Sequence, residues 1–221
     1  MTSQATKVSR SRKGRRKRPT REEKAIETRA ALLDAAGKVV GRYGYEGASI
    51  ARITSRAGVA QGTFYNYFED RQDLLDQLLP IMGREMLDYI RTYCPRDCTG
   101  AAREAMRMQA YFSFLESHPW FHRLVNEAET LAPRAHAVYF ADISSGYLRS
   151  LKRAMERGEL KGYTDDDLEP IAYMLLSVRT YLAQRYVYKN GKVKPVPDRV
   201  LKTYAEFIRR ALFVESDGGT G

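Results

Sequence analysis

The sequence predicts an all-α protein of about nine helices. Apolar residues recur every three or four positions through most of the 221 residues, which is the spacing of one buried helical face. No segment alternates apolar and polar residues for the length of a strand, so a sheet is not expected. Proline and glycine residues separate the periodic segments. The expected helices cover residues 21 to about 43, 50–57, 61–67, 71–93, 99–117, 119–130, 134–157, 166–188 and 197–214.

Ahead of the first helix lies a strongly basic segment. The chain carries a net charge of +10, and residues 1–30 hold eleven basic and three acidic side chains, so +8 of that charge is concentrated there. Residues 1–20 are therefore expected to form a disordered basic arm in front of a nearly neutral body. Such arms bind polyanions, which include nucleic acids, anionic membranes and acidic proteins.

Composition excludes several other classes of protein. No apolar run approaches the roughly 18–20 residues that cross a membrane, and no apolar signal core follows the basic start. Two cysteines cannot build a disulfide framework, which fits a reducing compartment. We therefore expect a cytoplasmic protein that does not partner a membrane.

The first three helices have signals at their ends. Ile26, Ala30 and Leu33 give the first helix an apolar face, and glycines between positions 41 and 47 end it. Ser49 is a suitable N-cap for the 50–57 helix, and Gly58 stands where a helix needs a left-handed residue at its end. The 61–67 helix follows directly, and a Gly-centred turn between two short helices is the minimum signature of a helix-turn-helix.

The second helix of this pair has two distinct faces. Phe64 and Phe68 can form a small core with Ile53, Ala57 and Val59. That packing leaves Gln61, Thr63, Tyr65 and Asn66 on the opposite surface. A helix of this size fits the major groove of DNA, where its N-terminal residues meet base edges.

The string Ala-Gly-Val-Ala-Gln-Gly-Thr-Phe-Tyr-Asn-Tyr-Phe over residues 57–68 resembles the tetracycline-repressor (TetR) family of bacterial transcription regulators. The likeness runs from about Thr28 to Leu75. It implies a three-helix DNA-binding domain over residues 21–70. A helical ligand-binding and dimerisation domain over 71–214 and a flexible tail over 215–221 would follow.

The resemblance also implies which residues contact DNA. Gln61 and Thr63 match the base contacts, while Tyr65, Asn66 and Tyr67 match contacts to the backbone and to thymine methyl groups. Ala60 departs from the usual Ser or Thr cap, which costs about 1 kcal/mol. The full expected set is Ser49, Arg52, Gln61, Gly62, Thr63, Tyr65, Asn66, Tyr67 and Arg71, with Arg15, Arg16, Lys17 and Arg18 from the arm.

The last two helices are expected to form a homodimer. Residues 171–178 are apolar nearly all round, so that helix must be buried on two sides, one toward a pocket and one toward a partner subunit. The final helix has one apolar stripe that includes Leu201, Tyr204 and Ile208. A dimer with twofold symmetry matches a palindromic operator in double-stranded DNA.

An aromatic, mostly apolar ligand pocket is expected in this second domain, although the same residues could simply be helix core. Five basic residues leave an acyl-coenzyme A or another anionic ligand open, although such residues more often form solvated helix faces: Arg149, Lys152, Arg153, Arg179 and Arg185. The expected ligand-binding residues are Phe112, Trp120, Phe121, Leu124, Glu127, Tyr139, Ile143, Tyr147, Tyr173 and Arg179.

No enzyme chemistry, metal site or cofactor is predicted. His118 and His122 are four residues apart, but no acid completes a metalloprotease pattern. Cys94 and Cys98 form a single pair without the second pair of a zinc site, and a redox role for them stays open.

The sequence therefore predicts a homodimeric, sequence-specific DNA-binding regulator, most simply a repressor that a small molecule releases from its operator. Two alternatives stay open. One is a nucleoid-type protein that binds DNA without sequence preference through its arm, and the other is a ligand-binding protein whose helix-turn-helix is vestigial. Deleting residues 1–20 separates the first alternative from the repressor, because a repressor would lose affinity but keep selectivity.

Overall fold

The computed structural model describes residues 20–95, 97–189 and 192–214. Within these ranges the chain is helical, as predicted. The arm residues Arg15, Arg16, Lys17 and Arg18 and the tail at 215–221 lie outside the described residues. The helices are α1 (Arg21–Gly47), α2 (Ile50–Ala57), α3 (Gln61–Phe64), α4 (Arg71–Tyr93), α5 (Gly100–Ser117), α6 (Phe121–Leu131), α7 (Pro133–Glu156), α8 (Leu168–Leu182) and α9 (Asp198–Ala211).

The helix predicted over 166–188 is divided into three parts. A 3₁₀ turn at Asp165–Asp167 precedes α8, and a π-helical turn at Ala183–Val187 follows it. Strands β1 (Tyr188–Lys189) and β2 (Lys192–Val193) then form a small antiparallel pair, contrary to the expectation that the chain has no sheet. Two-residue strands are too short to produce the alternating pattern from which strands are predicted.

Helix α1 continues further than predicted and ends in a kink. The Thr20 hydroxyl and the Glu23 side chain form a reciprocal capping box at its start. The helix continues through Gly41 in a regular helical conformation. Near its other end, Gly44 has a φ of +75°, a backbone conformation that residues with a side chain rarely adopt. The kink turns the backbone amide of Tyr45 toward α6.

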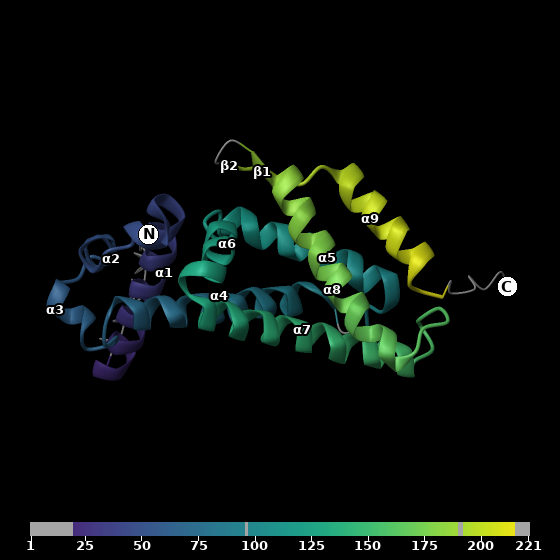
Figure 1. The fold of residues 1–221 in the computed structure, drawn as a ribbon, viewed down its shortest axis with the longest axis horizontal. Coiled ribbons are helices and arrows are strands. Elements are labelled where there is room, and N and C mark those ends of the chain that lie inside the picture. The colour runs from purple at the N-terminus through teal and green to yellow at the C-terminus, as the bar shows by residue number, and fades with distance from the viewer. Residues whose placement is uncertain (1–19, 96, 190–191, 215–221) are drawn as a thin grey trace, which may run out of the picture.

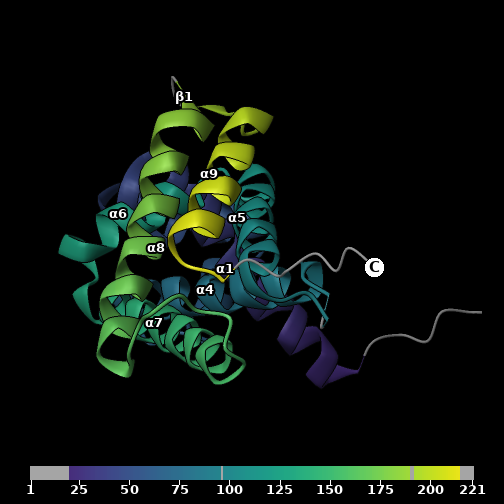
Figure 2. The same cartoon turned by 90° about the vertical axis from the view of Figure 1, so that its right-hand side faces the viewer.

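The helices form a small head and a larger body, joined by α4 (Figure 1). We call α1–α3 the head and α4–α9 the body. Helix α4 starts in the head and runs along α7 into the body, while α6 packs against α1. Helix α8 packs on α7, and α9 packs on α5. Figure 2 shows α8 and α9 on the same side of the body.

One continuous apolar core runs from the head into the body. Two close approaches explain glycines in the middle of helices. A Cβ on Gly83 would come 2.4 Å from the Tyr139 ring, and one on Gly41 would come 2.1 Å from the Trp120 Cβ. These glycines let α7 and α6 pack directly against the α4 and α1 backbones.

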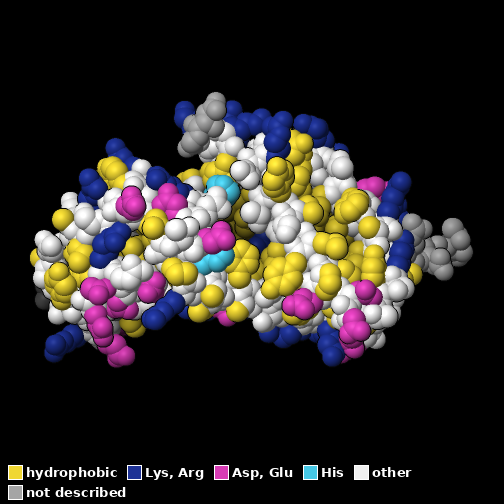
Figure 3. Space-filling view, in the orientation of Figure 1, with side chains coloured by type: hydrophobic (Ala, Val, Ile, Leu, Met, Phe, Trp, Pro, Cys, Tyr) yellow, Lys and Arg dark blue, Asp and Glu magenta, His cyan; other side chains and the backbone are white. Residues whose placement is uncertain are grey.

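The apolar stripe predicted for dimerisation packs mainly within the chain itself. Tyr204 and Ile208 of α9 are buried in the core, and Leu212, just beyond its end, is also buried. The exposed apolar side chains of this region come from other faces, namely Tyr173, Met174, Tyr181 and Phe207. Figure 3 shows hydrophobic side chains gathered over α8. In the described residues no helix is both long and apolar enough to cross a membrane.

Candidate nucleic-acid interface and ligand cavity

The two short helices of the head meet at a tight turn. The Ser49 hydroxyl accepts a hydrogen bond from the Arg52 amide (3.3 Å) and caps α2. Gly58 ends α2 with a φ of +71°, and its amide donates to the Ser55 carbonyl. Ala60 opens α3 without a side-chain cap. The predicted signals at both ends of α2 are confirmed.

A small apolar core holds α2 and α3 together. Ile53, Phe64 and Phe68 are almost completely buried, and the Phe64 and Phe68 ring centroids are 5.4 Å apart. Ala57 and Val59 are half-buried against the same core. The core predicted for the helix-turn-helix is therefore confirmed, and it fixes which face of α3 points outward.

The outward face of α3 is open to a partner. The helix is shorter than the predicted 61–67 segment, because residues 65–67 continue as a turn. Tyr65 is 56% exposed, with its ring edge-on to the Phe64 ring. A Cβ added at Gly62 would meet no atom within 4 Å, so the fold does not require glycine there. Gln61, Gly62, Tyr65 and Asn66 are exposed and Thr63 is half-buried.

The remaining predicted contacts of the head are engaged with the protein itself. Tyr67 is half-buried against the core, and the Ser49 hydroxyl is used by the α2 cap. The Arg52 guanidinium donates to the Gly47 carbonyl (2.7 Å) and lies 4.7 Å from the centroid of the Tyr43 ring. Arg52 is nevertheless exposed, so it stays accessible from outside.

Arg71, predicted to contact DNA, binds the backbone of its own chain. Its Nε donates to the Ala48 carbonyl (2.8 Å), and the same guanidinium donates to the Tyr45 carbonyl. The side chain is half-buried. In this structure Arg71 is therefore a strut that ties the start of α4 to the end of α1.

A cationic cavity of about 790 Å³ lies in the body, at the end of α4 that is remote from Arg71. Its described lining includes six arginines and no acidic side chain, with Leu87, Ile90, Ile143 and Tyr147 among its apolar residues. The arginines are Arg91 from α4, Arg103 and Arg107 from α5, Arg149 and Arg153 from α7, and Arg179 from α8.

Some of these arginines have partners and others do not. Arg91 is 2.6 Å from Asp88, and Arg107 donates to the Ser150 hydroxyl (2.8 Å). Arg149 and Arg153 are exposed, and neither side chain makes a hydrogen bond or an ion pair within the described residues. Clustered like charges repel each other, so this arrangement favours binding of a multiply charged anion.

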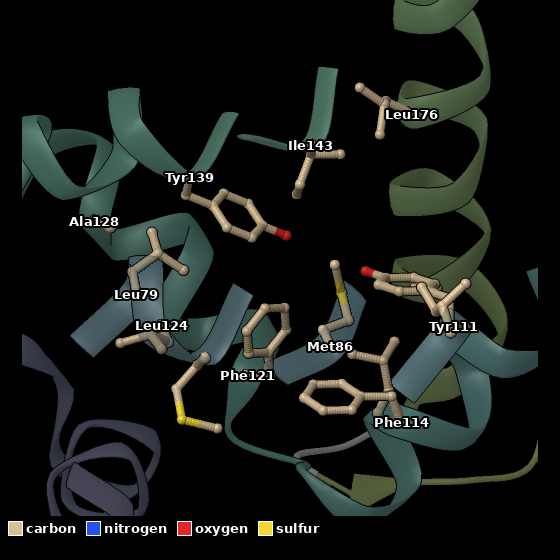
Figure 4. Close-up of a cluster of buried hydrophobic side chains, with 14 of the residues drawn as sticks. Leu79, Met86, Tyr111, Phe114, Phe121, Leu124, Ala128, Tyr139, Ile143 and Leu176 are labelled. Atoms are coloured by element: carbon tan, nitrogen blue, oxygen red, sulfur yellow. The ribbon is translucent and has the colours of Figure 1, made fainter. Parts of the chain in front are cut away.

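The predicted ligand-binding residues separate into several groups. Ile143, Tyr147 and Arg179 line the cavity. Phe121, Leu124 and Tyr139 belong with Ile143 to a buried cluster that Figure 4 shows between α4, α6, α7 and α8. Phe112 is buried in the core with its ring 5.7 Å from that of Tyr111.

Trp120 and Glu127 do not line the cavity but lie where the body touches the head. Trp120 packs on the glycines of α1, as described above. The Tyr45 amide donates to Glu127 Oε2 (2.7 Å), and Arg123 Nε donates to Glu127 Oε1 (2.5 Å). We call Glu127, Arg123 and Trp120 the α6 clamp. The Glu127 contact depends on the α1 kink at Gly44, which the sequence pattern did not reveal.

Tyr173 also lies away from the cavity. It is 47% exposed, like its neighbour Met174 at 63%, and both belong to the outer face of α8. Leu175, Leu176 and Arg179 form the inner, buried face of the same helix. A helix that is apolar on all sides gives no sequence signal for which face turns inward, which explains the misplacement.

Three cavity arginines were missed as ligand-binding candidates. Arg91, Arg103 and Arg107 come from α4 and α5, and Arg149 and Arg153 were considered only as part of a possible anion site. A signal was available, because Arg103/Arg107 and Arg149/Arg153 are both pairs spaced four residues apart on one helix. Only the packing of α5 and α7 around α4 shows that the two pairs line the same cavity.

Cys94 and Cys98 are both free thiols, and Cys94 lines the cationic cavity. Burial raises the pKa of the Cys94 thiol, which reduces its reactivity at neutral pH. Among the described residues, no group of three or more His, Cys, Asp or Glu side chains is placed to hold a metal ion.

Comparisons with known proteins agree with this geometry. Residues 32–78 match the family model of bacterial regulatory proteins of the tetR family. The chain is 29% identical over 84 residues to the fatty acid metabolism regulator protein of Bacillus subtilis, a match that spans 38% of this chain and only 43% of that protein. It is 21% identical over 182 residues to the transcriptional repressor KstR2 of Rhodococcus jostii, spanning 81% and 88% of the two chains.

Solved structures share the fold. The regulator FadR of Bacillus halodurans superposes with a TM-score of 0.68 at 21% identity, over 82% of this chain and 94% of that one. FadR of B. subtilis in complex with stearoyl-CoA gives the same TM-score at 20% identity, over 81% and 96%. With the helix-turn-helix, the matched segment and the common fold, the chain belongs to the tetR family of bacterial regulatory proteins and is a DNA-binding transcriptional regulator.

Proposed function

We propose that this protein is a dimeric, sequence-specific repressor that an acyl thioester of coenzyme A releases from its operator. The observation that carries the effector class is the cavity, whose described lining residues include six arginines and no acidic side chain. Coenzyme A presents several phosphate charges, and arginine forms paired hydrogen bonds with phosphate oxygens. The stearoyl-CoA complex of the FadR relative supports the same class.

DNA reading is assigned to the exposed face of α3. Gln61 and Thr63 stand at its start, where a recognition helix meets base edges, and Tyr65 and Asn66 follow on the exposed turn. Gly62 lies between Gln61 and Thr63. The space that a side chain would occupy there is open, which allows the DNA backbone to approach closely. Arg52 is exposed next to this face and supplies a nearby cation.

Helix α4 and the α6 clamp offer a route from effector to DNA. The C-terminal half of α4 lines the cavity, and Arg71 at its start holds the head. The α6 clamp holds the α1 kink at the same joint. An effector that binds better when α4 has shifted would therefore change the placement of the head. In a dimer this changes the spacing of the two recognition helices.

A second copy of the chain is the proposed partner of the body. The exposed apolar side chains Tyr173, Met174 and Tyr181 lie on α8, and Phe207 lies on α9. Large apolar side chains gathered on one surface favour protein association. Twofold pairing through this surface would place two heads on a palindromic site.

The test is displacement from a selected operator. A binding-site selection first identifies the preferred duplex, and palmitoyl-CoA, free CoA and palmitate are then titrated into the complex while DNA binding is followed by fluorescence anisotropy. We expect palmitoyl-CoA, or an acyl-CoA with another acyl group titrated in the same way, to release the DNA and free palmitate to have little effect. Failure of every acyl-CoA to bind or to release the DNA would reject the proposed effector class.

Matched charge variants test the cavity. Arg149→Ala/Arg153→Ala should weaken binding of acyl-CoA about 10- to 100-fold, since charge-assisted hydrogen bonds contribute about 1.5–3 kcal/mol each and solvent exposure reduces that value. The control Arg134→Ala/Lys152→Ala removes two exposed charges from the same helix α7 outside the cavity lining. Equal weakening by both double variants would show a general charge effect instead of a site.

Deleting residues 1–19 addresses the alternative of arm-driven, non-specific DNA binding. The proposed repressor should lose affinity and salt dependence but keep its preference for the selected sequence. Loss of all selectivity would favour the alternative.

A further inference from the structure

Arg179 differs from the other cavity arginines in being buried. It is 5% exposed, on the inner face of α8, and its guanidinium carbon lies 4.2 Å from the centroid of the Tyr111 ring. Its Nε is fully buried and has no hydrogen-bond partner, and no described residue makes an ion pair with the guanidinium. A buried arginine in this condition is uncommon, because a desolvated charge is costly unless it is paired.

The acid that acts on Arg179 is already used by other groups. Glu104 is the acidic group whose charge influences Arg179. One Glu104 oxygen accepts hydrogen bonds from the Tyr147 hydroxyl (3.1 Å) and the Tyr204 hydroxyl (2.9 Å), and the other lies 3.5 Å from Arg107. The Glu104 carboxylate is thus already bound by Tyr147, Tyr204 and Arg107. The Arg179 guanidinium is left without an anion to pair with.

Arg179 is also the point where two cavities meet. It lines the large cationic cavity and a second cavity of about 130 Å³ between α6, α7 and α8. The second cavity is lined by aromatic and polar groups that include Tyr111, His122, Asn126 and Tyr139. Its acid, Glu129, is exposed. A ligand that enters past the arginine pairs of α5 and α7 would therefore reach a buried cation.

A saturated alkyl chain does not suit this inner end. Placing methylene groups against an unpaired guanidinium leaves its donors unsatisfied and keeps the charge uncompensated. A carboxylate supplies both the missing charge and oxygens that match the planar guanidinium fork. A neutral carbonyl oxygen would accept a hydrogen bond but would leave the charge unpaired.

We propose that Arg179 binds a carboxylate carried by the acyl part of the effector, so that the effector is a coenzyme A thioester of a dicarboxylic acid. This inference rests on the proposed function, since it places the phosphates of coenzyme A at the exposed arginines of the cationic cavity. It assigns two separate tasks: the exposed arginines bind the phosphates, and the buried arginine selects the acyl group.

The test compares pairs of thioesters that differ only at the far carbon. Binding of succinyl-, adipoyl-, suberoyl- and sebacoyl-CoA to the full chain is measured calorimetrically beside butyryl-, hexanoyl-, octanoyl- and decanoyl-CoA. We expect at least one dicarboxylic member to bind about tenfold or more tightly than its partner of equal length. This comparison uses the unaltered protein, so it does not depend on how any variant folds.

Variants then locate the selectivity. Arg179→Met and Arg179→Gln should abolish the preference for the dicarboxylic member of each pair, and Arg185→Met, which removes an exposed arginine just beyond α8, should leave the preference intact. Equal or tighter binding of every monocarboxylic partner would overturn the inference but leave an acyl-CoA effector standing. Binding of neither series would overturn both. A preference that persists in both Arg179 variants would overturn the role of Arg179.

Discussion

The head and the body use arginine in opposite ways. In the head and its joint with α4, Arg71 donates to two backbone carbonyls, Arg52 donates to the Gly47 carbonyl, and Arg29 donates to Gln77 Oε1 (2.5 Å). In the body, Arg149 and Arg153 face the cavity without a hydrogen bond or an ion pair in the described residues, and Arg179 is buried against the Tyr111 ring with its Nε unpaired. These arginines of the head and its joint are therefore already bound to the protein itself, whereas the body contains charges that a ligand would complete.

This difference predicts opposite effects of removing an arginine from each region. Arg71→Ala should lower the free energy of unfolding by about 2–3 kcal/mol, because charge-assisted hydrogen bonds contribute about 1.5–3 kcal/mol each. Chemical denaturation followed by circular dichroism measures the change. If Arg71 acts only as a strut, the salt dependence of DNA binding should stay the same. If the plot of log K for DNA binding against log salt concentration is less steep by about 0.9 in the variant, Arg71 instead contacts a phosphate.

The α6 clamp should show an intermediate effect on stability and a large one on coupling. Glu127→Ala leaves the Tyr45 amide without its acceptor and leaves Arg123 with only the Gly41 carbonyl, which should cost about 1–2 kcal/mol. We expect the variant to bind both DNA and acyl-CoA, while acyl-CoA no longer displaces the DNA effectively. Anisotropy titrations with and without acyl-CoA measure this. Unchanged displacement in a folded variant would remove the α6 clamp from the coupling route.

Arg179→Met should leave stability unchanged or raise it by about 1 kcal/mol. Replacing a buried, unpaired cation with an apolar side chain of similar length removes a desolvation cost. Thermal unfolding in the absence of ligand measures the difference. A loss of stability as large as that of Arg71→Ala would mean that Arg179 is already satisfied in the unliganded protein.

Gly62→Ala should have the smallest effect on folding. The added methyl group meets no atom of the protein, and alanine favours a helix by about 0.5–1 kcal/mol over glycine, so stability should be equal or slightly higher. Binding to the selected operator should nevertheless weaken. Gly146→Ala on α7, where the added Cβ also meets no atom within 4 Å, is the matched control. Equal DNA binding by both variants would remove Gly62 from the DNA contact.

The same contrast explains how much of the molecule could be predicted from its sequence. The helix-turn-helix depends on neighbours in the chain, so the Ser49 cap, the Gly58 turn and the Phe64–Phe68 core were all found correctly. The cavity depends on residues from four helices far apart in the sequence: the sequence predicts Ile143, Tyr147 and Arg179 as ligand-binding residues but not Arg91, Arg103 and Arg107. The contact of Glu127 with the Tyr45 amide requires the kink at Gly44, and Trp120 packs on Gly41 of a helix distant in the sequence, so the pattern within α6 predicts neither contact. Tyr173 was assigned to the cavity because α8 is apolar on both sides.

The central claim is that the cationic cavity and the α3 surface are linked through one joint. Thermodynamic reciprocity tests it most directly: the Kd for the selected operator is measured with and without saturating acyl-CoA, and the Kd for acyl-CoA is measured with and without operator. We expect each ligand to weaken the other by the same factor, at least about tenfold. Simultaneous binding with both Kd values unchanged would contradict the account.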